Sequence, residues 1–555
     1  MDRVRIDISI AELARLSGAT ESPALEPRTA KDAHPLRNQP VRPQPLTSDR
    51  RRRAARPGPA LRAAAGAAVL SLLALTACSG DEARPTSGDE APEPTPATGE
   101  ADELTVVDTK HVPGLSEERT ASKDGGVEID VAYPTVRNAG PFAERLAEIT
   151  EQDAADFAGA ADDPKSYTVD WQLSVAGPGV MAVRLTQREK DGEGERTGYS
   201  TYWYDTESGH TAYSTELLGG QRQLDRLDAQ VKKRLKDEDG VDVSTLHPIA
   251  RLYDSIGFNP DGDLVVEFDE GQIAPVKDGR VHAVVPREDA EPLLSEFGER
   301  ARSAAVVVTP EFRIGRAANA PKDGPPEGGV PGVMAAADSE VDCSDPESKC
   351  IALTFDDGPG ARTPELLDAL AEYDARATFF VTGGPVREHP DVVRREYAEG
   401  HEVANHTVHH PDLTSVGKDE IDEELSTVNE LVRRETGYTM DLMRPPYGAT
   451  DGQVDEVTER LGQAQILWSI DTNDWRDHNP GLVADRAVED ARPGSIVLMH
   501  DIHDTTIDAV PDILKRLDEK GYTMVTVSQL LGETEPGRSY IDGHPEPEES
   551  PSPSD

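Results

Sequence analysis

The sequence has few basic residues for its length. Its 555 residues include 57 Lys and Arg against 105 Asp and Glu, a net charge of −48. Since 13 of the basic and 7 of the acidic residues lie in residues 1–77, the remainder keeps 44 and 98, a net of −54. This balance repels nucleic acid and anionic lipid surfaces and disfavours both as partners. A solvated acidic surface that aids solubility accounts for most of these carboxylates.

Long hydrophobic runs are also lacking, except near the N-terminus. Ala63–Ala77 is apolar and follows a basic segment, Arg50–Arg53 and Arg56. The run is short for a permanent membrane span, and the pattern is typical of an export signal. Its end, Leu75 to Cys78, resembles the lipobox of bacterial lipoproteins, which implies lipidation of Cys78 and attachment to the outer face of the cell membrane. An uncleaved anchor helix and an ordinary signal peptide are the alternatives, and each places the rest of the chain outside the cytoplasm.

Methionine is scarce before the middle of the chain. Residues 1–78 are predicted to be an N-terminal extension followed by the lipoprotein signal peptide. The extension, Met1–Asp49, is polar and Pro-rich and has no periodic pattern of apolar residues. A signal peptide seldom carries so long an extension, so a start codon assigned too far upstream is expected. Because Met1 is the only methionine before Met181, a later start would use a non-ATG codon, for example at Val41.

Only three cysteines occur, Cys78, Cys343 and Cys350. With Cys78 assigned to lipid, the other two remain as an even pair in an oxidising compartment, which predicts a disulfide at the entry to the last domain. Its loop is small, so the expected stabilisation is about 2 kcal/mol. Two free thiols are the alternative.

Proline and glycine, 43 and 46 residues, are concentrated in segments that lack large apolar side chains, as in linkers. These segments predict a disordered tether over 79–103, a linker over 316–342 and a disordered tail over 534–555. Two folded domains are therefore expected, 104–315 and 343–533, and the chain is long enough for both cores.

The region 104–315 has a mixed α/β pattern without a catalytic cluster. Strands are predicted over 127–133, 167–187 and 199–214, and a helix over 141–157. The segments Asp130–Val136, Trp203–Gly209 and Phe258–Pro275 resemble the domain shared by RsiV-type anti-sigma factors and PdaC-type deacetylases. The resemblance implies an extracytoplasmic α+β accessory module that binds wall glycan or a wall-directed protein. A spacer without a ligand is the alternative.

From Lys349 onward, strands and helices alternate regularly. Strands are predicted at 351–355, 377–381, 401–404, 442–445, 464–470, 495–499 and 523–527, with helices such as 364–373 and 419–434 between them. Repeated βα units predict an α/β domain whose parallel sheet is closed or nearly closed into a distorted (β/α) barrel. The α+β domain that precedes it is expected to be the smaller of the two. The active site of such a barrel lies at the carboxyl ends of its strands.

Polar motifs occur at five of these strand ends. They are Thr354–Gly358, His406–His410, Arg444–Gly448, Asp471–Trp475 and Leu498–His500. In order and type they match the motifs of the NodB-like polysaccharide deacetylases, carbohydrate esterase family 4, over Cys350–Leu531. No motif lacks a residue that the family uses in catalysis, so the resemblance implies an active, metal-dependent enzyme.

The spacing of His406 and His410 suggests a metal site. Four residues apart, they would lie on one face of a helical turn, and a carboxylate as third ligand would leave an open position, as catalytic zinc requires. The resemblance implies that Asp357 is this carboxylate and that the ion is Zn²⁺, with Co²⁺ as an alternative. Without the adjacent Asp-Asp pair, two such histidines would more often be ordinary surface residues.

The resemblance implies roles for the remaining motif residues. Asp356 is the general base toward the attacking water, and Arg444 keeps it ionised and oriented. The backbone N–H of Tyr447 donates to the oxyanion. His500, paired with Asp474, protonates the leaving amine. Trp475 and Leu498 wall the pocket for the acetyl methyl group, although ordinary packing explains these two equally.

Other activities and substrates remain open. Glycoside hydrolysis needs two carboxyl groups about 5–9.5 Å apart across the scissile bond, which the adjacent Asp356 and Asp357 fit poorly. Chitooligosaccharide deacetylation and acetylxylan ester hydrolysis use the same motifs, and a wall-binding or sensing lipoprotein is the non-enzymatic alternative. We expect N-deacetylation of peptidoglycan aminosugars. A tether of about 25 residues samples only tens of ångströms above the membrane, where peptidoglycan is the acetylated glycan within reach, and no aromatic-rich carbohydrate-binding module is evident beside the last domain.

Overall fold

The computed structural model describes residues 93–124, 126–315, 329–334, 341–345 and 348–543. The predicted signal peptide with Cys78, most of the predicted tether and linker, and residues 544–555 of the predicted tail lie outside the described residues. No helix in the described ranges is long and apolar enough to cross a membrane.

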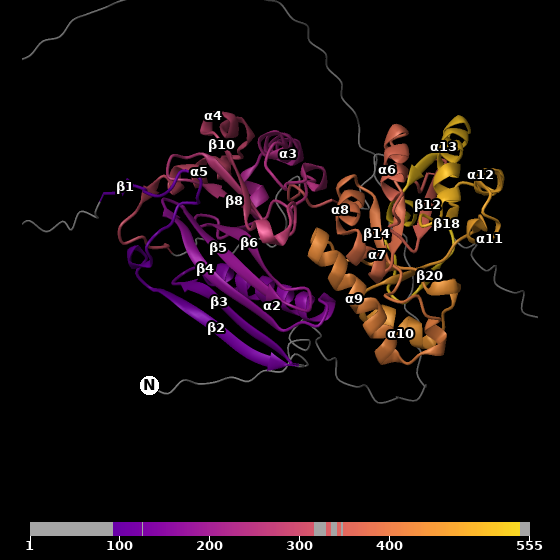
Figure 1. Cartoon of the computed structure of the whole chain (residues 1–555), viewed down its shortest axis with the longest axis horizontal. Coiled ribbons are helices and arrows are strands. Elements are labelled where there is room, and N and C mark those ends of the chain that lie inside the picture. The colour runs from indigo at the N-terminus through magenta and orange to yellow at the C-terminus, as the bar shows by residue number, and fades with distance from the viewer. Residues whose placement is uncertain (1–92, 125, 316–328, 335–340, 346–347, 544–555) are drawn as a thin grey trace, which may run out of the picture. The chain divides into compact units, whose positions relative to one another are not determined.

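The first folded region is built on a six-stranded sheet in the order β2-β3-β4-β5-β6-β7 (Figure 1). The strands are β2 (Leu115–Asp124), β3 (Val127–Val136), β4 (Ser166–Gly177), β5 (Val180–Lys190), β6 (Glu195–Asp205) and β7 (Thr211–Ala212). Only β3 and β4 pair in parallel. A parallel pair needs a crossover, which α2 (Gly140–Ala160) supplies, and this helix buries Phe142, Leu146 and Phe157. The strand predicted at 127–133 and the helix predicted at 141–157 are confirmed, whereas the stretches 167–187 and 199–214 are each two antiparallel strands, β4 with β5 and β6 with β7.

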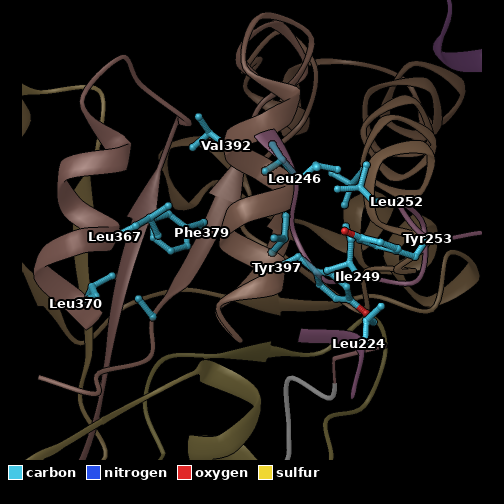
Figure 2. Close-up of a cluster of buried hydrophobic side chains, with 14 of the residues drawn as sticks. Leu224, Leu246, Ile249, Leu252, Tyr253, Leu367, Leu370, Phe379, Val392 and Tyr397 are labelled. Atoms are coloured by element: carbon cyan, nitrogen blue, oxygen red, sulfur yellow. The ribbon is translucent and has the colours of Figure 1, made fainter. Parts of the chain in front are cut away.

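A second, antiparallel sheet in the order β10-β9-β8 completes this region. Its strands are β8 (Ser255–Phe258), β9 (Leu264–Phe268) and β10 (Val281–Val285). The helices of this part of the region are α3 (Gln221–Leu235), α4 (Arg287–Ala290) and α5 (Glu296–Ala305). Figure 2 shows part of the buried apolar cluster to which this region contributes Leu224, Leu246, Ile249, Leu252 and Tyr253. The α+β class is as expected, but the region spans more residues than the barrel region, so the expectation that it is the smaller one is wrong.

The second folded region is a parallel α/β barrel that strand pairing does not close among the described residues. Its strands follow the order β17-β18-β12-β13-β14-β15-β16-β20, and β19 also pairs with β12. They are β12 (Cys350–Asp356), β13 (Thr378–Val381), β14 (Glu402–Asn405), β15 (Leu442–Met443), β16 (Ala464–Ile466), β17 (Ile470–Asp471), β18 (Ile496–His500), β19 (Thr523–Val525) and β20 (Ser539–Tyr540). The predicted fold class, a distorted (β/α) barrel, is confirmed.

Helices cover the outside of this sheet (Figure 1). They are α6 (Thr363–Glu372), α7 (Gly383–Glu388), α8 (Pro390–Ala398), α9 (Lys418–Thr436), α10 (Gly452–Arg460), α11 (Asp474–Asp477), α12 (Pro480–Glu489), α13 (Asp504–Glu519) and α14 (Val527–Leu531). All residues of β12 are buried, as expected for a strand covered on both faces. In Figure 2, Leu367 and Leu370 of α6, Phe379 of β13, and Val392 and Tyr397 of α8 form one apolar layer.

The predicted strand over 464–470 is two strands. β16 pairs with β15 and β20, whereas β17 pairs with β18. Between them the carbonyl oxygen of Leu467 accepts a hydrogen bond from Arg444 Nη2 at 3.1 Å. This carbonyl therefore points toward the arginine and not toward a neighbouring strand. The chain therefore changes partner strands at this point.

Two segments predicted to be disordered are partly folded. β20 lies within the predicted tail, 534–555, and pairs with β16. β1 (Thr95–Pro96) lies within the predicted tether, 79–103, and pairs with β11 (Val307–Val308). Backbone pairing provides these short strands with partners that their composition does not reveal.

Cys343 and Cys350 are joined by a disulfide with an S–S distance of 2.04 Å. Since Cys350 is the first residue of β12, the bridge lies where the chain enters the barrel region, at the place the cysteine count predicts.

Candidate active site

The five polar motifs lie at the carboxyl ends of barrel strands. Asp356 ends β12 and is paired in register with Phe380 of β13 and with His500, the last residue of β18. His406 follows β14, and Arg444 follows β15. The parallel sheet thus gathers on one rim side chains that lie up to 144 residues apart in the sequence, from Asp356 to His500.

Asp357, His406 and His410 form a group that fits a metal ion. Oδ1 of Asp357 lies 3.6 Å from Nε2 of each histidine, and the three ligand atoms lie within 4.8 Å of one another. Nδ1 of His406 lies 2.7 Å from the carbonyl oxygen of Arg444, which assigns the proton to Nδ1 and leaves Nε2 free as a ligand. Burial lowers the pKa of His406 to about 3, so the ring is neutral, as metal binding requires. One carboxylate and two imidazoles are a donor set typical of catalytic zinc with an open position.

A loop, not the expected helical turn, brings the two histidines together. Thr407 and His410 have positive φ values of 68° and 55°. Asn405 Oδ1 accepts from the Thr407 N–H at 2.9 Å, and Thr407 Oγ1 accepts from the His410 N–H at 3.0 Å. Glu424 of α9 accepts from the N–H groups of the two intervening residues. The four-residue spacing therefore identified the correct pair of histidines, but the two lie in a loop and not on one face of a helical turn.

Asp356 and Arg444 form a buried ion pair beside this group. Arg444 Nη1 donates to Asp356 Oδ1 at 2.7 Å and to Thr354 Oγ1 at 2.8 Å. The guanidinium is fully buried and lies 4.0 Å from the centre of the Phe380 ring. Burial raises the pKa of Asp356, while the charges of Arg444 and His500 oppose the rise. This arrangement holds a carboxylate in one orientation with a basicity suited to taking a proton from water.

His500 is held by Asp474 on the other side of β12. Asp474 Oδ1 lies 2.9 Å from Nδ1 of His500, and Asp474 Oδ2 accepts from the His500 backbone N–H at 2.7 Å. Thr506 of α13 donates to the same Oδ2 at 2.7 Å. Burial opposes protonation of His500, but the hydrogen bond that the ring donates to Asp474 and the charges of Asp356 and Asp474 outweigh it and raise the pKa of His500 to about 9. The imidazole is therefore protonated at neutral pH and suited to act as an acid.

Tyr447 lies at the mouth of the site. It belongs to the three-residue turn Pro446–Gly448 and has a positive φ of 61°. The N–H groups at the start of such a turn have no partner within it, which leaves the Tyr447 N–H available as a donor. Its ring is 70% exposed and packs edge-on against His410, with ring centres 4.7 Å apart.

The two predicted pocket-wall residues differ in exposure. Leu498 lies on β18 and is buried, whereas Trp475 at the start of α11 is 49% exposed. Contact of either residue with an acetyl methyl group stays a prediction.

Three residues that contact the site had no role assigned from sequence. Thr354 accepts a hydrogen bond from Arg444 and donates to the Val497 carbonyl at 2.7 Å. Glu424 was detectable as a charged residue one turn from Ile421, on the apolar face of α9. Thr506 gave no signal, because its contact with Asp474 spans 32 residues.

Comparisons with known families and proteins find relatives of this chain. A family model described as "Polysaccharide deacetylase" matches residues 344–466. Peptidoglycan-N-acetylglucosamine deacetylase PgdA of Listeria monocytogenes is 43% identical over 197 residues, 35% of this chain and 42% of the relative. Peptidoglycan-N-acetylmuramic acid deacetylase PdaC of Bacillus subtilis is 41% identical over 187 residues, 34% of this chain and 39% of the relative.

A shorter relative is matched over nearly its whole length. The chitooligosaccharide deacetylase of Rhizobium leguminosarum bv. trifolii is 37% identical over 198 residues, 33% of this chain and 92% of the relative. By contrast, the matches span less than half of the two peptidoglycan deacetylases.

Proposed function

Because this chain belongs to the polysaccharide deacetylase family, we propose that it hydrolyses N-acetyl groups of a polysaccharide, and that its substrate is an aminosugar of peptidoglycan. One observation carries the proposal. The Asp357, His406 and His410 group lies on the same rim as the Asp356–Arg444 pair and the His500–Asp474 pair. A ligand set, a base and an acid together supply what amide hydrolysis needs.

We propose zinc as the metal that Asp357, His406 and His410 hold. A bound zinc ion would act as a Lewis acid toward the acetyl carbonyl and the attacking water. Among the described residues, one carboxylate and two imidazole nitrogens are placed to act as ligands, which would leave coordination positions open for substrate.

The chain's own residues would perform the proton transfers. Asp356 takes a proton from the attacking water as the new C–O bond forms at the acetyl carbon, and Arg444 keeps Asp356 oriented. The Tyr447 N–H donates to the oxygen that gains negative charge. His500 gives its proton to the sugar nitrogen as the C–N bond breaks. The products are acetate and a free amine.

Peptidoglycan is favoured as the substrate by two independent considerations. Two relatives are peptidoglycan deacetylases by name, one for N-acetylglucosamine and the other for N-acetylmuramic acid. The lipobox resemblance at Cys78 supports a membrane-tethered location, where peptidoglycan is the acetylated glycan within reach. Chitin oligomers are the second candidate, favoured by the relative that is matched over 92% of its length.

We also propose that the α+β region acts as an accessory module. Its three RsiV/PdaC-like segments support binding of wall glycan or a wall-directed protein. Pull-down of purified wall sacculi by the full chain, but not by a variant lacking 104–315, would support this role. Equal retention of both proteins on sacculi would exclude it.

The proposed reaction is tested by metal removal. The purified chain should release acetate from peptidoglycan fragments, chelation should abolish release, and zinc or cobalt should restore it. Full activity in a preparation shown to be metal-free would refute the mechanism. For the tether, a Cys78→Ala variant should lose metabolic lipid label and leave the membrane fraction, whereas label on that variant would refute lipidation of Cys78.

A further inference from the structure

The turn that follows β12 lies directly against the segment that follows β18. A Cβ added to Gly358 would lie 2.2 Å from Asp501 Oδ1, and a Cβ added to Gly360 would lie 2.9 Å from the Asp501 carbonyl oxygen. Both distances are shorter than real Cβ contacts, so a side chain at either position would force Asp501 to shift. Asp356 and His500, which pair in register at the ends of β12 and β18, immediately precede these two segments.

Asp501 joins three segments of the chain through one carboxylate oxygen. Its side chain is 1% exposed, and Oδ2 accepts hydrogen bonds from Thr363 Oγ1 and, at 3.4 Å, from the Gly360 N–H. Thr363 Oγ1 in turn accepts from the Gly360 N–H at 2.8 Å. Thr363 is the first residue of α6 and is fully buried. The exit of β18, the turn after β12 and the start of α6 therefore share one hydrogen-bonded cluster.

The other oxygen of Asp501, Oδ1, has no hydrogen-bond partner among the described residues. It is the atom that a Cβ on Gly358 would meet, so this oxygen lies against the glycine and Oδ2 alone accepts the hydrogen bonds of the cluster.

The turn held in this way carries two groups of the proposed mechanism. Asp356 and Asp357 immediately precede Gly358, and Asp357 has a positive φ of 72°. Three further hydrogen bonds hold this turn: the Asp357 N–H donates to the Phe380 carbonyl at 3.2 Å, and Thr382 donates through its hydroxyl to the Asp357 carbonyl at 3.0 Å and through its N–H to the Gly358 carbonyl at 3.2 Å. All three lie on the β13 side. Asp501 supplies the anchor on the β18 side, next to His500.

We propose that Asp501 is a positioning residue: through Thr363 and Gly360 it fixes the turn bearing Asp356 and Asp357 relative to His500. The effect of Asp501 on Asp356 and His500 as catalytic groups rests on the proposed deacetylation. Its effect on zinc binding through Asp357 does not. Groups that orient ligand-bearing segments typically change metal affinity by about 10- to 100-fold when removed.

The test measures the zinc dissociation constant by competition with a chelator. Asp501→Ala and Thr363→Val remove the cluster's acceptor and its hydroxyl, and each should weaken zinc binding about 10-fold or more. Asp501→Asn keeps an oxygen acceptor and Thr363→Ser keeps a hydroxyl, so each should stay within about threefold of the wild-type constant. Leu514→Ala, a fully buried change on α13, is the control that lowers the melting temperature without changing zinc affinity.

Wild-type zinc affinity in both Asp501→Ala and Thr363→Val would overturn the proposal. The proposal would also be overturned if Asp501→Asn and Thr363→Ser lost as much zinc affinity as Asp501→Ala and Thr363→Val. The same holds if Leu514→Ala lost as much zinc affinity at an equal loss of stability, because the effect would then follow stability alone. If the wild-type chain releases no acetate from any glycan, the proposed function fails, yet the zinc constants still decide the role of Asp501. If Asp501→Ala does not fold, the comparison of Thr363→Val with Thr363→Ser decides.

Discussion

Asp474 binds His500 at two points, at its backbone N–H at 2.7 Å and at its ring Nδ1 at 2.9 Å. This double contact fixes both the ring and the strand end that carries it. It also gives Asp474 and Asp356 different roles, since Asp474 serves the acid and Asp356 serves as the base. The pH dependence of catalysis should reflect that separation.

Asp474→Asn should move the alkaline limb of the rate profile to lower pH. The pKa of His500 is raised to about 9, so the protonated acid persists up to that pH and activity falls above it. Without the Asp474 charge and with a weaker hydrogen bond, the pKa should fall toward the ordinary value of 6.5. The measurement is kcat/KM against pH, with Asp477→Asn as a control on the same helix. An alkaline limb that stays near pH 9 in Asp474→Asn would contradict the assignment of His500 as the acid.

Asp356→Asn and Asp357→Asn should separate catalysis from metal binding. Asp356→Asn should retain zinc and lose turnover by a factor of about 10² or more, as expected for a missing general base. Asp357→Asn and His406→Ala should lose zinc itself, because each removes a ligand. Zinc content by elemental analysis and acetate release distinguish the two outcomes. If Asp356→Asn empties the site while Asp357→Asn retains zinc, the roles of the two aspartates are exchanged.

Arg444→Met should damage both stability and catalysis. The guanidinium donates to Asp356, to Thr354 and to the carbonyls of Ile466 and Leu467, so its removal leaves a buried carboxylate without its cation. Breaking a buried ion pair costs about 3–5 kcal/mol of unfolding free energy. Loss of the positive charge also raises the pKa of Asp356, so the acid limb of kcat/KM should move to higher pH. An unchanged acid limb in a folded Arg444→Met protein would show that Arg444 does not tune the base.

Removing the Cys343–Cys350 disulfide should have a small effect that is confined to stability. The loop spans a sequence separation of 7, so the expected loss is about 2 kcal/mol. A Cys343→Ser/Cys350→Ser double variant, measured by denaturant unfolding, should keep the wild-type kcat/KM. A large loss of activity at temperatures where the variant is folded would show that the bridge also shapes the site.

The sequence revealed the barrel because its strands are short apolar runs, each followed by a polar motif. The seven predicted strand segments all overlap observed strands, and the single large error, 464–470, arises where a carbonyl turns away from the ladder toward Arg444. β20 was missed because its pairing with β16 depends on a segment more than seventy residues away in the sequence.

Within the candidate site, the motif residues were predictable and their supporting contacts were not. The structure brings Asp357, His406 and His410 together through positive-φ loop geometry that the i,i+4 spacing does not reveal. Thr506 and Asp501 each act through a side chain from a different segment, and no local pattern marks such contacts. Periodicity and spacing thus identify the residues that meet, whereas the orientation of each group is set by tertiary hydrogen bonds.

The most direct test of the central claim is acetate release by the purified zinc-loaded chain from peptidoglycan fragments, chitin oligomers and acetylxylan in parallel, followed by mass analysis of the glycans. Release from peptidoglycan fragments is predicted to exceed release from the other two, and the resulting muropeptides to be lighter by one acetyl group for each acetate formed. Release from chitin oligomers or acetylxylan at rates far above those on every peptidoglycan fragment would contradict the substrate. Release from none of the three, with zinc bound, would contradict the deacetylase itself.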